Sequence, residues 1–241
     1  MNKSLIKIKN LKVKYGELTV LHNINLSITE GKITAILGGS GCGKTTLLKS
    51  LLKLQPISSG TIEIFHKNIH KDDFQAELKK IGMVFQNSAL LNSMSVAENL
   101  SIPLNQHTDL PQEVVEQIIN SKLQLVNLAK AGPLLPAELS GGMKKRAAVA
   151  RAIALDPVIL FCDEPSAGLD PITSASLDNL LIKLKNQLNM SIVIVTHELS
   201  SVRRIADDIV FLHDGQVLFQ GSFDQIKKSD NEHIREFFDS E

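Results

Sequence analysis

The chain contains 241 residues, of which 43% are apolar, and this size and composition favour a globular protein with a well-buried core. Its 26 Lys and Arg residues balance its 26 Asp and Glu residues, so no net field would attract nucleic acid, and we expect no nucleic-acid partner. No apolar run reaches the length of a signal-peptide core or the ~20 residues that span a bilayer, which predicts a cytosolic protein. Cys42 and Cys162 lie in segments whose local roles a disulfide would disturb, as fits a reducing compartment.

The predicted elements change in kind along the chain. Short alternating segments in the first third predict strands at residues 5–13, 24–28, 33–37, 60–65 and 81–85. Helical spacing dominates between residues 95 and 155, where Pro111 opens one run and Ser140 can cap a longer one. After residue 155, strands and helices alternate, with strands predicted at residues 158–162, 191–196, 208–212 and 216–219 and a helix at 171–188. This order predicts an α/β fold: a largely parallel sheet with helices on both faces, interrupted by a helical insertion.

Residues 231–238 have the spacing of an amphipathic helix. Ile234, Phe237 and Phe238 would lie on one side of it. Docking of this helix on the protein's own core is the preferred interpretation, and binding of a partner is the alternative.

One segment matches the pattern G-x-x-x-x-G-K-[ST] of a phosphate-binding loop. Its residues are Gly38, Gly39, Ser40, Gly41, Cys42, Gly43, Lys44 and Thr45. In such a loop the glycines let main-chain N–H groups surround the phosphates, the lysine reaches the β/γ oxygens, and the hydroxyl ligates Mg²⁺. Residues 32–37 precede the loop like a buried strand and residues 44–54 follow it like a helix, which is the context that the loop requires. The segment therefore predicts binding of ATP and Mg²⁺.

Two carboxylates, Asp163 and Glu164, follow the apolar residues 158–162. We expect them at the carboxyl end of a buried strand, where open α/β sheets bind ligands. In this position Asp163 would hold the Mg²⁺ shell opposite Thr45, and Glu164 would orient and polarise the attacking water. On its own, a pair of carboxylates at a strand end is solvent-exposed and without function about as often as it is catalytic. The phosphate-binding loop earlier in the chain favours the catalytic interpretation.

Ser140, Gly141 and Gly142 begin the helix that is predicted to run to residue 155. A glycine-rich helix start is a site for an anion, because its unpaired N–H groups and the helix dipole point at the ligand. The sequence has one phosphate-binding loop, so a second anion site suggests that each ATP is held between two copies of the chain in a two-fold symmetric pair. A simple capped helix start is the alternative for this segment alone.

Three further residues are candidates because of their place in the pattern. His197 follows the predicted strand 191–196, where its imidazole can hydrogen-bond the γ-phosphate and Glu164, although a lone histidine is more often structural. Gln86 ends another predicted strand and can reach Mg²⁺ or the attacking water. Tyr15 is the only tyrosine and can stack on adenine, with packing in the core as an equal alternative.

Together these segments resemble the nucleotide-binding subunit of ATP-binding-cassette (ABC) transporters, over nearly the whole chain. The resemblance implies an ATPase whose catalytic residues are Lys44, Gln86, Glu164 and His197. It implies that ATP is contacted by the adenine-stacking Tyr15, by the Walker A residues 38–45 with Thr46, and, from the second copy, by Ser140, Gly141, Gly142 and Asp170. It assigns the Mg²⁺ ligands to Thr45, Gln86 and Asp163. It identifies residues 139–143 as the signature motif of the family, in which Met143 takes the place of the Gln that most commonly ends the motif.

The resemblance also implies a fold. It predicts a single ABC ATPase domain over residues 1–241, with a mostly parallel, RecA-like P-loop NTPase core, an antiparallel β subdomain and a helical subdomain. The core with its N-terminal β subdomain would take about residues 1–86 and 156–228, the helical subdomain about 87–155, and a helical tail about 229–241.

Three stretches narrow the resemblance: residues 85–91, 140–146 and 168–173 look like those of the ATPases paired with MCE proteins. In bacteria these ATPases belong to Mla-type systems that move phospholipids between the inner and outer membranes. The likeness implies a homodimer that drives an integral-membrane permease through a groove at about residues 87–104. It places the chain on the cytoplasmic face of the inner membrane, as a peripheral protein in one complex with an MCE-domain protein.

Two other functions are left open. The ATPase of an amino-acid or other small-solute importer would carry the same catalytic motifs, and the fold alone does not exclude it. A soluble cassette ATPase that acts on a cytosolic scaffold, as in iron–sulfur cluster assembly, is the alternative from another class. Against the scaffold stand the apolar residues 88–91 after Gln86, which are suited to receive a short helix of a partner.

Overall fold

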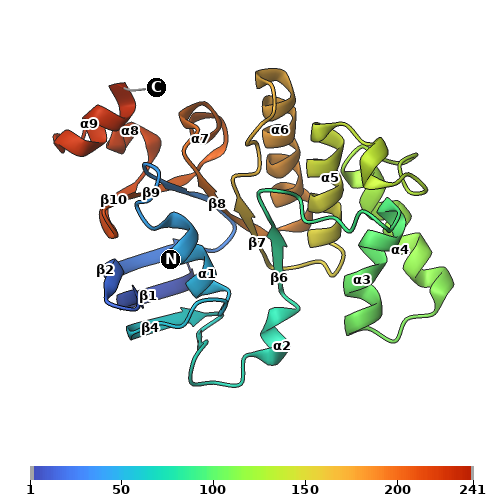
Figure 1. Ribbon diagram of the computed structural model, residues 1–241, viewed down its shortest axis with the longest axis horizontal. Helices are drawn as coiled ribbons and strands as arrows, with labels where there is room; N and C mark the ends of the chain where they lie inside the picture. Colours follow the sequence, from blue (N-terminus) through green and yellow to red (C-terminus); the bar gives the residue numbers. More distant parts are fainter. Residues whose placement is uncertain (1–2, 240–241) are drawn as a thin grey trace. The chain divides into compact units, whose positions relative to one another are not determined.

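The computed structural model describes residues 3–239, which divide into two compact units. The first unit combines residues 3–78 with 191–239, and the second takes residues 79–190. Figure 1 shows the elements of both units. Each unit contains fully buried side chains, such as Ile36 in the first and Leu160 in the second. The single domain and the subdomain boundaries that the resemblance implies, at about residues 86 and 156, stay a prediction.

The first unit begins with a four-stranded antiparallel sheet, which confirms the predicted β subdomain. Its strands follow the order β2-β1-β4-β5, with β1 at Ser4–Tyr15, β2 at Leu18–Thr29, β4 at Ser59–Ile64 and β5 at Lys67–Asn68. Ile6 and Ile8 of β1 are buried while Lys7 and Lys9 are exposed, which is the alternation of a strand with one face on the core. Gly60 permits β4 to approach β1, because a Cβ there would lie 2.4 Å from the carbonyl oxygen of Asn10.

Parallel strands form the centre of the same unit. These are β3 (Ile33–Leu37), β8 (Ser191–Thr196) and β9 (Asp208–His213), with β3 parallel to both of the others, and β10 (Gln216–Gly221) antiparallel at the edge of β9. Every residue of β3 and β8 is buried, as expected for strands covered on both faces. Leu37 lies opposite Thr196 in the register, so the residues that follow β3 and β8 emerge at the same edge.

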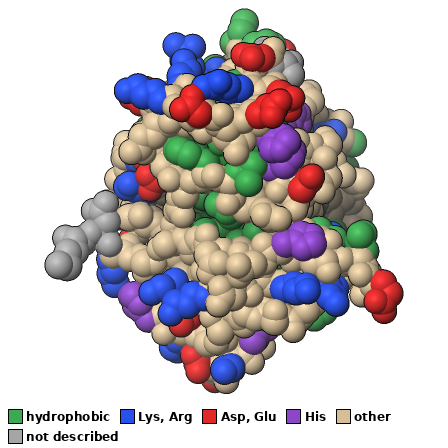
Figure 2. Space-filling view, turned by 90° about the vertical axis from the view of Figure 1, so that its left-hand side faces the viewer, with side chains coloured by type: hydrophobic (Ala, Val, Ile, Leu, Met, Phe, Trp, Pro, Cys, Tyr) green, Lys and Arg blue, Asp and Glu red, His purple; other side chains and the backbone are tan. Residues whose placement is uncertain are grey.

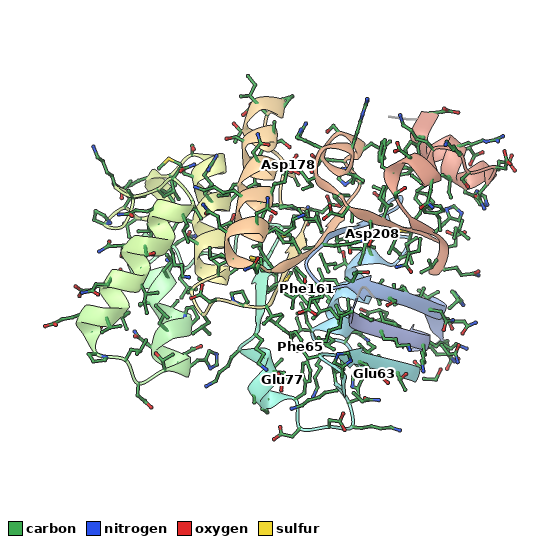
Figure 3. The ribbon with its side chains drawn as sticks, turned by 180° about the vertical axis from the view of Figure 1, so that it is seen from behind. Glu63, Phe65, Glu77, Phe161, Asp178 and Asp208 are labelled. Atoms are coloured by element: carbon green, nitrogen blue, oxygen red, sulfur yellow. The ribbon has the colours of Figure 1, made fainter. Side chains whose placement is uncertain are left out.

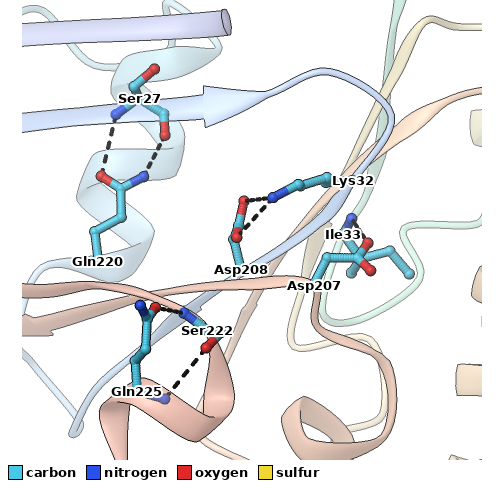
Figure 4. A network of polar contacts seen from close by, with 8 residues as sticks. All are labelled: Ser27, Lys32, Ile33, Asp207, Asp208, Gln220, Ser222 and Gln225. Carbon is cyan, nitrogen blue, oxygen red and sulfur yellow. Dashed lines mark hydrogen bonds and ion pairs between the residues drawn. The ribbon is translucent and has the colours of Figure 1, made fainter. Parts of the chain in front are cut away.

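Polar contacts fix the other end of β3 (Figure 4). The Lys32 ammonium forms an ion pair with Asp208, with an N–O distance of 2.8 Å, and the Ile33 N–H donates to the Asp207 carboxylate at 2.8 Å. These bonds tie the start of β3 to the start of β9. They therefore set the position of the strand that leads into the phosphate-binding loop.

Five short helices belong to the first unit: α1 (Lys44–Leu51), α2 (Gln75–Leu78), α7 (Leu199–Ile205), α8 (Phe223–Ile226) and α9 (Glu232–Asp239). Helix α9 is docked on the core of its own unit, which confirms the preferred interpretation of the tail. Ile234 is buried, and Phe237 and Phe238 pack against the same cluster, with the rings of Phe237 and Phe211 5.3 Å apart. On the side where Figure 1 shows α9 and β10, hydrophobic side chains gather in the middle of the surface and charged side chains surround them (Figure 2).

The second unit pairs two parallel strands with four helices and a short 3₁₀ turn. Its elements are β6 (Ile81–Val84), α3 (Val96–His107), α4 (Gln112–Leu125), the turn Pro136–Glu138, α5 (Gly141–Ala152), β7 (Ile159–Asp163) and α6 (Pro171–Leu188). Helix α5 is central, since it contacts α3, α4, α6 and β6. Phe161 on β7 and Asp178 on α6, labelled in Figure 3, are fully buried. None of the helices within residues 3–239 has the length and apolar character needed to cross a membrane.

Candidate nucleotide-binding and catalytic site

The phosphate-binding loop connects β3 to α1, as the sequence predicts. Gly38 passes close to a neighbouring strand, because a Cβ on it would lie 2.1 Å from the main-chain oxygen of Leu212. Gly43 precedes α1 with a φ of 106°, a conformation that side-chain-bearing residues rarely adopt. No side chain caps the N-terminus of α1, so its first N–H groups stay available to a phosphate. The loop therefore fits the phosphates of a nucleoside triphosphate.

Lys44 lies inside the curve of this loop and is 8% exposed. Its ammonium donates to the carbonyl oxygens of Gly38 at 2.6 Å and Gly39 at 2.9 Å. The neighbouring Cys42 thiol is also buried, and burial raises its pKa although the charge of Lys44 opposes the shift. The loop thus places the Lys44 ammonium beside a thiol whose thiolate form is disfavoured by burial.

Two other predicted residues belong to the first unit. Tyr15 ends β1 opposite Leu18 and is 45% exposed, so packing in the core, the alternative for this residue, is wrong. His197 directly follows β8 and is exposed. Because β3 and β8 are parallel and Leu37 pairs with Thr196, the residues that follow them, Gly38 and His197, lie at the same edge of the sheet. Contact of Tyr15 with adenine and of His197 with phosphate stays a prediction.

In the second unit, Gln86 lies just after β6, and the two carboxylates lie at the end of the neighbouring strand β7. Val84 of β6 lies opposite Cys162 of β7, so Gln86, Asp163 and Glu164 come to the same edge of this strand pair. Glu164 has a φ of 45°, and its carbonyl oxygen accepts a hydrogen bond from the Ala167 N–H at 3.2 Å. The chain therefore turns sharply at the proposed catalytic residue.

The proposed Mg²⁺ ligands are Thr45 in the first unit and Gln86 and Asp163 in the second. They offer a hydroxyl, an amide and a carboxylate, which are the oxygen donors that Mg²⁺ prefers. Within residues 3–239, no three His, Cys, Asp or Glu side chains gather as a metal site. Each of these donors suits Mg²⁺, which proteins usually bind through one or two carboxylates together with phosphates and water.

The signature turn, Ser140 to Gly142, is a capped helix start that lies beside the N-terminus of α6. Ser140 caps α5, and its hydroxyl oxygen accepts from the Met143 N–H at 3.3 Å. Gly142 leaves room for α6, since a Cβ there would be 2.6 Å from the methyl carbon of Thr173. Thr173 in turn donates to Asp170, which caps α6.

Asp170 is therefore held at the start of α6 through its carboxylate. The oxygens accept from the Thr173 hydroxyl at 2.5 Å and from the N–H groups of Ile172 and Thr173 at 3.0 Å. These bonds hold the pKa of the Asp170 carboxyl below its ordinary value, and the bond from the Thr173 hydroxyl has the largest effect. Ser140, Gly142 and Asp170 are thus brought together within the second unit, while their contact with ATP from a second copy stays a prediction.

The predicted partner segment, residues 87–104, presents apolar side chains at its start. Leu91 is 48% exposed, and Leu90 and Met94 are half-buried. The fully buried Asn99 of α3 fixes this loop, because its amide accepts from the Leu91 N–H at 2.8 Å and donates to the carbonyls of Leu91 and Met94 at 3.1 Å. The apolar side chains are therefore displayed on a braced loop.

One residue of this region was missed by the sequence analysis. Lys145 belongs to the basic triplet 144–146, a pattern typical of a solvated helix face, yet it is 7% exposed. Its ammonium donates to the carbonyl oxygens of Gln86 at 2.6 Å and Glu164 at 3.3 Å. Lys145 lies one helical turn after Gly141 at the start of α5, and nothing in this position alone indicates that its side chain is buried.

The family model described as ABC transporter matches residues 21–167 of the chain. The chain belongs to the ABC transporter family. It is an ATP-binding subunit of this family and an ATPase, which confirms the predicted family, fold class and enzyme activity.

Known proteins that are similar over nearly the whole of this chain include two kinds of ABC transporter subunit. The chain is 39% identical to the intermembrane phospholipid transport system ATP-binding protein MlaF of Haemophilus influenzae, over 100% of this chain and 92% of that protein. It is 37% identical to the methionine import ATP-binding protein MetN of Campylobacter jejuni, over 97% of this chain and 75% of that protein. The solved ABC cassette MJ0796, a dimer bound to ADP and phosphate, aligns with a TM-score of 0.80 and 32% identity over 90% of this chain and 98% of that one.

Proposed function

We propose that this ABC ATPase drives phospholipid movement between membranes as part of an MCE-associated, Mla-type system. The observation that carries the proposal is the 39% identity to Haemophilus influenzae MlaF along the entire chain. The signature supports it, since Met143 takes the place of the commonest Gln and is followed by a basic triplet. Import of methionine or another small solute is the second candidate, because MetN of Campylobacter jejuni is 37% identical.

In the proposed mechanism, the first unit binds the nucleotide. Tyr15 would stack on adenine, while the Walker A loop with Thr46 would surround the phosphates and Lys44 would neutralise the β- and γ-phosphate oxygens. When bound, Mg²⁺ would be held by Thr45, Gln86 and Asp163. Its positive charge would stabilise the negative charge that develops on the phosphate oxygens.

The second unit would supply the hydrolytic group. Glu164 would accept a hydrogen bond from the attacking water and so align the water oxygen with the γ-phosphorus. Gln86 would contact the same water. His197 of the first unit would donate to the γ-phosphate. Phosphoryl transfer needs mainly positioning and charge stabilisation, so no covalent step on the protein is required.

Two copies would form the complete site. A single chain has one Walker A loop and one signature turn, and Ser140 and Gly142 at the start of α5 would form the anion site for the ATP that the second copy binds. ATP held between the loop of one copy and the signature turn of the other would stabilise the pair. Hydrolysis would then release it.

The permease would dock at residues 87–104, and the ATPase would then be a peripheral protein on the cytoplasmic face of the inner membrane. Supporting this, Leu91 on the braced loop is 48% exposed, and Phe85, which directly follows β6, is 41% exposed. An apolar surface of this kind suits a short amphipathic helix of a partner. An MCE-domain protein would complete the assembly.

The test is reconstitution of the chain with the membrane proteins that co-purify with it. In liposomes, we expect ATP to drive transfer of a fluorescent phospholipid to acceptor vesicles, and we expect a complex carrying Glu164→Gln not to do so. Parallel assays measure uptake of labelled methionine. Uptake without phospholipid transfer would establish the importer instead, and the absence of any membrane protein in the purified complex would favour the scaffold ATPase.

A further inference from the structure

Lys145 carries a buried positive charge near the two residues to which we assign water positioning. Its ammonium is 2.6 Å from the carbonyl oxygen of Gln86 and 3.3 Å from that of Glu164. A buried charge is costly unless hydrogen bonds compensate for its lost hydration. Its neighbour Arg146 instead reaches the Val126 carbonyl and the Ser176 hydroxyl. Lys145 is thus the member of the basic triplet that bonds to both segments.

The main chain at Glu164 needs such support. A residue with a side chain rarely adopts a φ of 45°, and such conformations persist where several contacts fix them. Here the Glu164 carbonyl accepts two hydrogen bonds, from the Ala167 N–H at 3.2 Å and from the Lys145 ammonium. The first bond closes the turn, and the second ties the turn to helix α5.

The segment after Gln86 is held from the same helix. Arg151, near the end of α5, donates to the carbonyl oxygens of Ala89 at 2.6 Å and Ser88 at 3.0 Å. Both acceptor residues have positive φ angles, 49° and 61°. Helix α5 therefore bonds to three carbonyls between residues 86 and 89, and through Lys145 also to Glu164.

We propose that Lys145 is a positioning residue for ATP hydrolysis, which holds the main chains of Gln86 and Glu164 in a fixed relation to the signature helix. The proposal rests on the roles assigned to Gln86 and Glu164 above. Because α5 begins at the signature turn, a displacement of the turn would move Lys145 and hence both carbonyls. Binding of ATP to the signature of one copy would in this way be transmitted to the water-positioning groups of the same copy.

The test replaces Lys145 by Met, which keeps the length and apolar stem of the side chain and removes the donors. In the full chain purified with its membrane partners, we expect kcat to fall about tenfold to a hundredfold, as when a positioning contact is lost. We expect the KM for ATP to change less than about threefold, because the variant leaves the Walker A loop intact. Lys145→Arg, which keeps a buried cation with several donors, should recover most of the lost kcat.

Lys122 provides a matched control within the second unit. It is equally buried, but its ammonium pairs with Asp156. Lys122→Met should therefore lower the melting temperature and leave the kcat of the folded protein unchanged. If Lys145→Met behaves in the same way, Lys145 is only structural and the proposal fails.

Glu164→Gln separates this proposal from the proposed function. When Glu164→Gln is inactive and Lys145→Met retains wild-type kcat, the positioning role is wrong while the catalytic assignment stands. When Glu164→Gln hydrolyses ATP like the wild type, the catalytic assignment fails and the role of Lys145 fails with it. Loss of kcat in both variants, with recovery in Lys145→Arg, supports both.

Discussion

The ammonium of Lys44 lies 2.6 Å from the carbonyl oxygen of Gly38, the first residue of its own loop. Both residues are buried, and a Cβ on Gly38 would lie 2.1 Å from the main-chain oxygen of Leu212. The charge is therefore held inside the loop by main-chain oxygens. A triphosphate in the loop would meet a cation that is already in place.

Lys44→Ala should weaken ATP binding strongly. Hydrogen bonds to charged groups contribute roughly 1.5–3 kcal/mol each, so the loss of this cation should reduce affinity about tenfold to more than a hundredfold. Titration with a fluorescent ATP analogue measures the effect. Lys49→Ala, which alters an exposed lysine of the same helix, is the control and should bind ATP normally. Equal affinity in the two variants would contradict the assignment of Lys44.

Cys42 should react slowly with maleimides at neutral pH. Its thiol is 6% exposed, and burial raises its pKa from the ordinary value of 9.0, so little reactive thiolate is present at pH 7. The labelling rate should rise with pH as the thiolate forms, and ATP should slow it further by filling the loop. Cys42→Ser should stay active and resist the reagent. Labelling that is fast at pH 7 or indifferent to ATP would argue against this placement of the thiol.

Gly142→Ala should destabilise the second unit, because its Cβ would lie 2.6 Å from the Thr173 methyl carbon. The bond to Asp170 prevents Thr173 from turning away freely, so we expect a loss of about 1–3 kcal/mol in the free energy of unfolding. Thr173→Ser removes the methyl group, keeps the hydroxyl, and should restore part of the loss. Gly141→Ala is the control, with its nearest atom at 3.6 Å. Urea denaturation that ranks the two alanine variants equally would show that the contact is unimportant.

The sequence predicted best those elements whose signals are local. The strands 33–37 and 191–196 are largely apolar and β-branched, and helix 171–188 is bounded by Asp170 as N-cap and by Asn189 in the left-handed conformation. Helices α7 and α8 have only seven and four residues, too few for a helical period to be recognised. They form because tertiary packing buries Val202 and Ile226.

The same distinction holds for the candidate site. The phosphate-binding loop is one contiguous segment, so its residues and its place between a strand and a helix could be predicted. Lys145 could not be predicted, because its two acceptors are 59 and 19 positions away in the sequence. Within a basic triplet its charge looks solvated, and only the packing of α5 beside β6 brings Gln86 to it.

Asp170 should make the stability depend on pH. The Thr173 hydroxyl, followed by main-chain N–H groups, lowers the pKa of this carboxyl in the folded state, so the ionised form stabilises the fold. That stabilisation is present above the unfolded pKa of about 3.9 and is lost as the pH falls through the lower folded value. Asp170→Asn should therefore melt below the wild type at pH 7, and the difference should vanish at the acid end. Thr173→Val, which removes the hydroxyl that bonds to Asp170, should reduce this difference in melting temperature. A difference that does not depend on pH would show that ionisation of Asp170 is not its cause.

Leu91→Asp should separate ATP hydrolysis from the work done on a membrane partner. The side chain is 48% exposed, so a carboxylate there remains hydrated in the isolated chain and should leave the fold and basal ATPase activity intact, since the proposed catalytic groups are unchanged. In a docked complex the same carboxylate would lose its hydration against an apolar helix, which is unfavourable without a partner charge. We therefore expect the variant to lose co-purification with the permease and phospholipid transfer. Leu110→Asp is the matched control, because Leu110 is 41% exposed and lies beyond residues 87–104. Wild-type co-purification of Leu91→Asp, or equal loss in both variants, would exclude this loop as the specific docking surface.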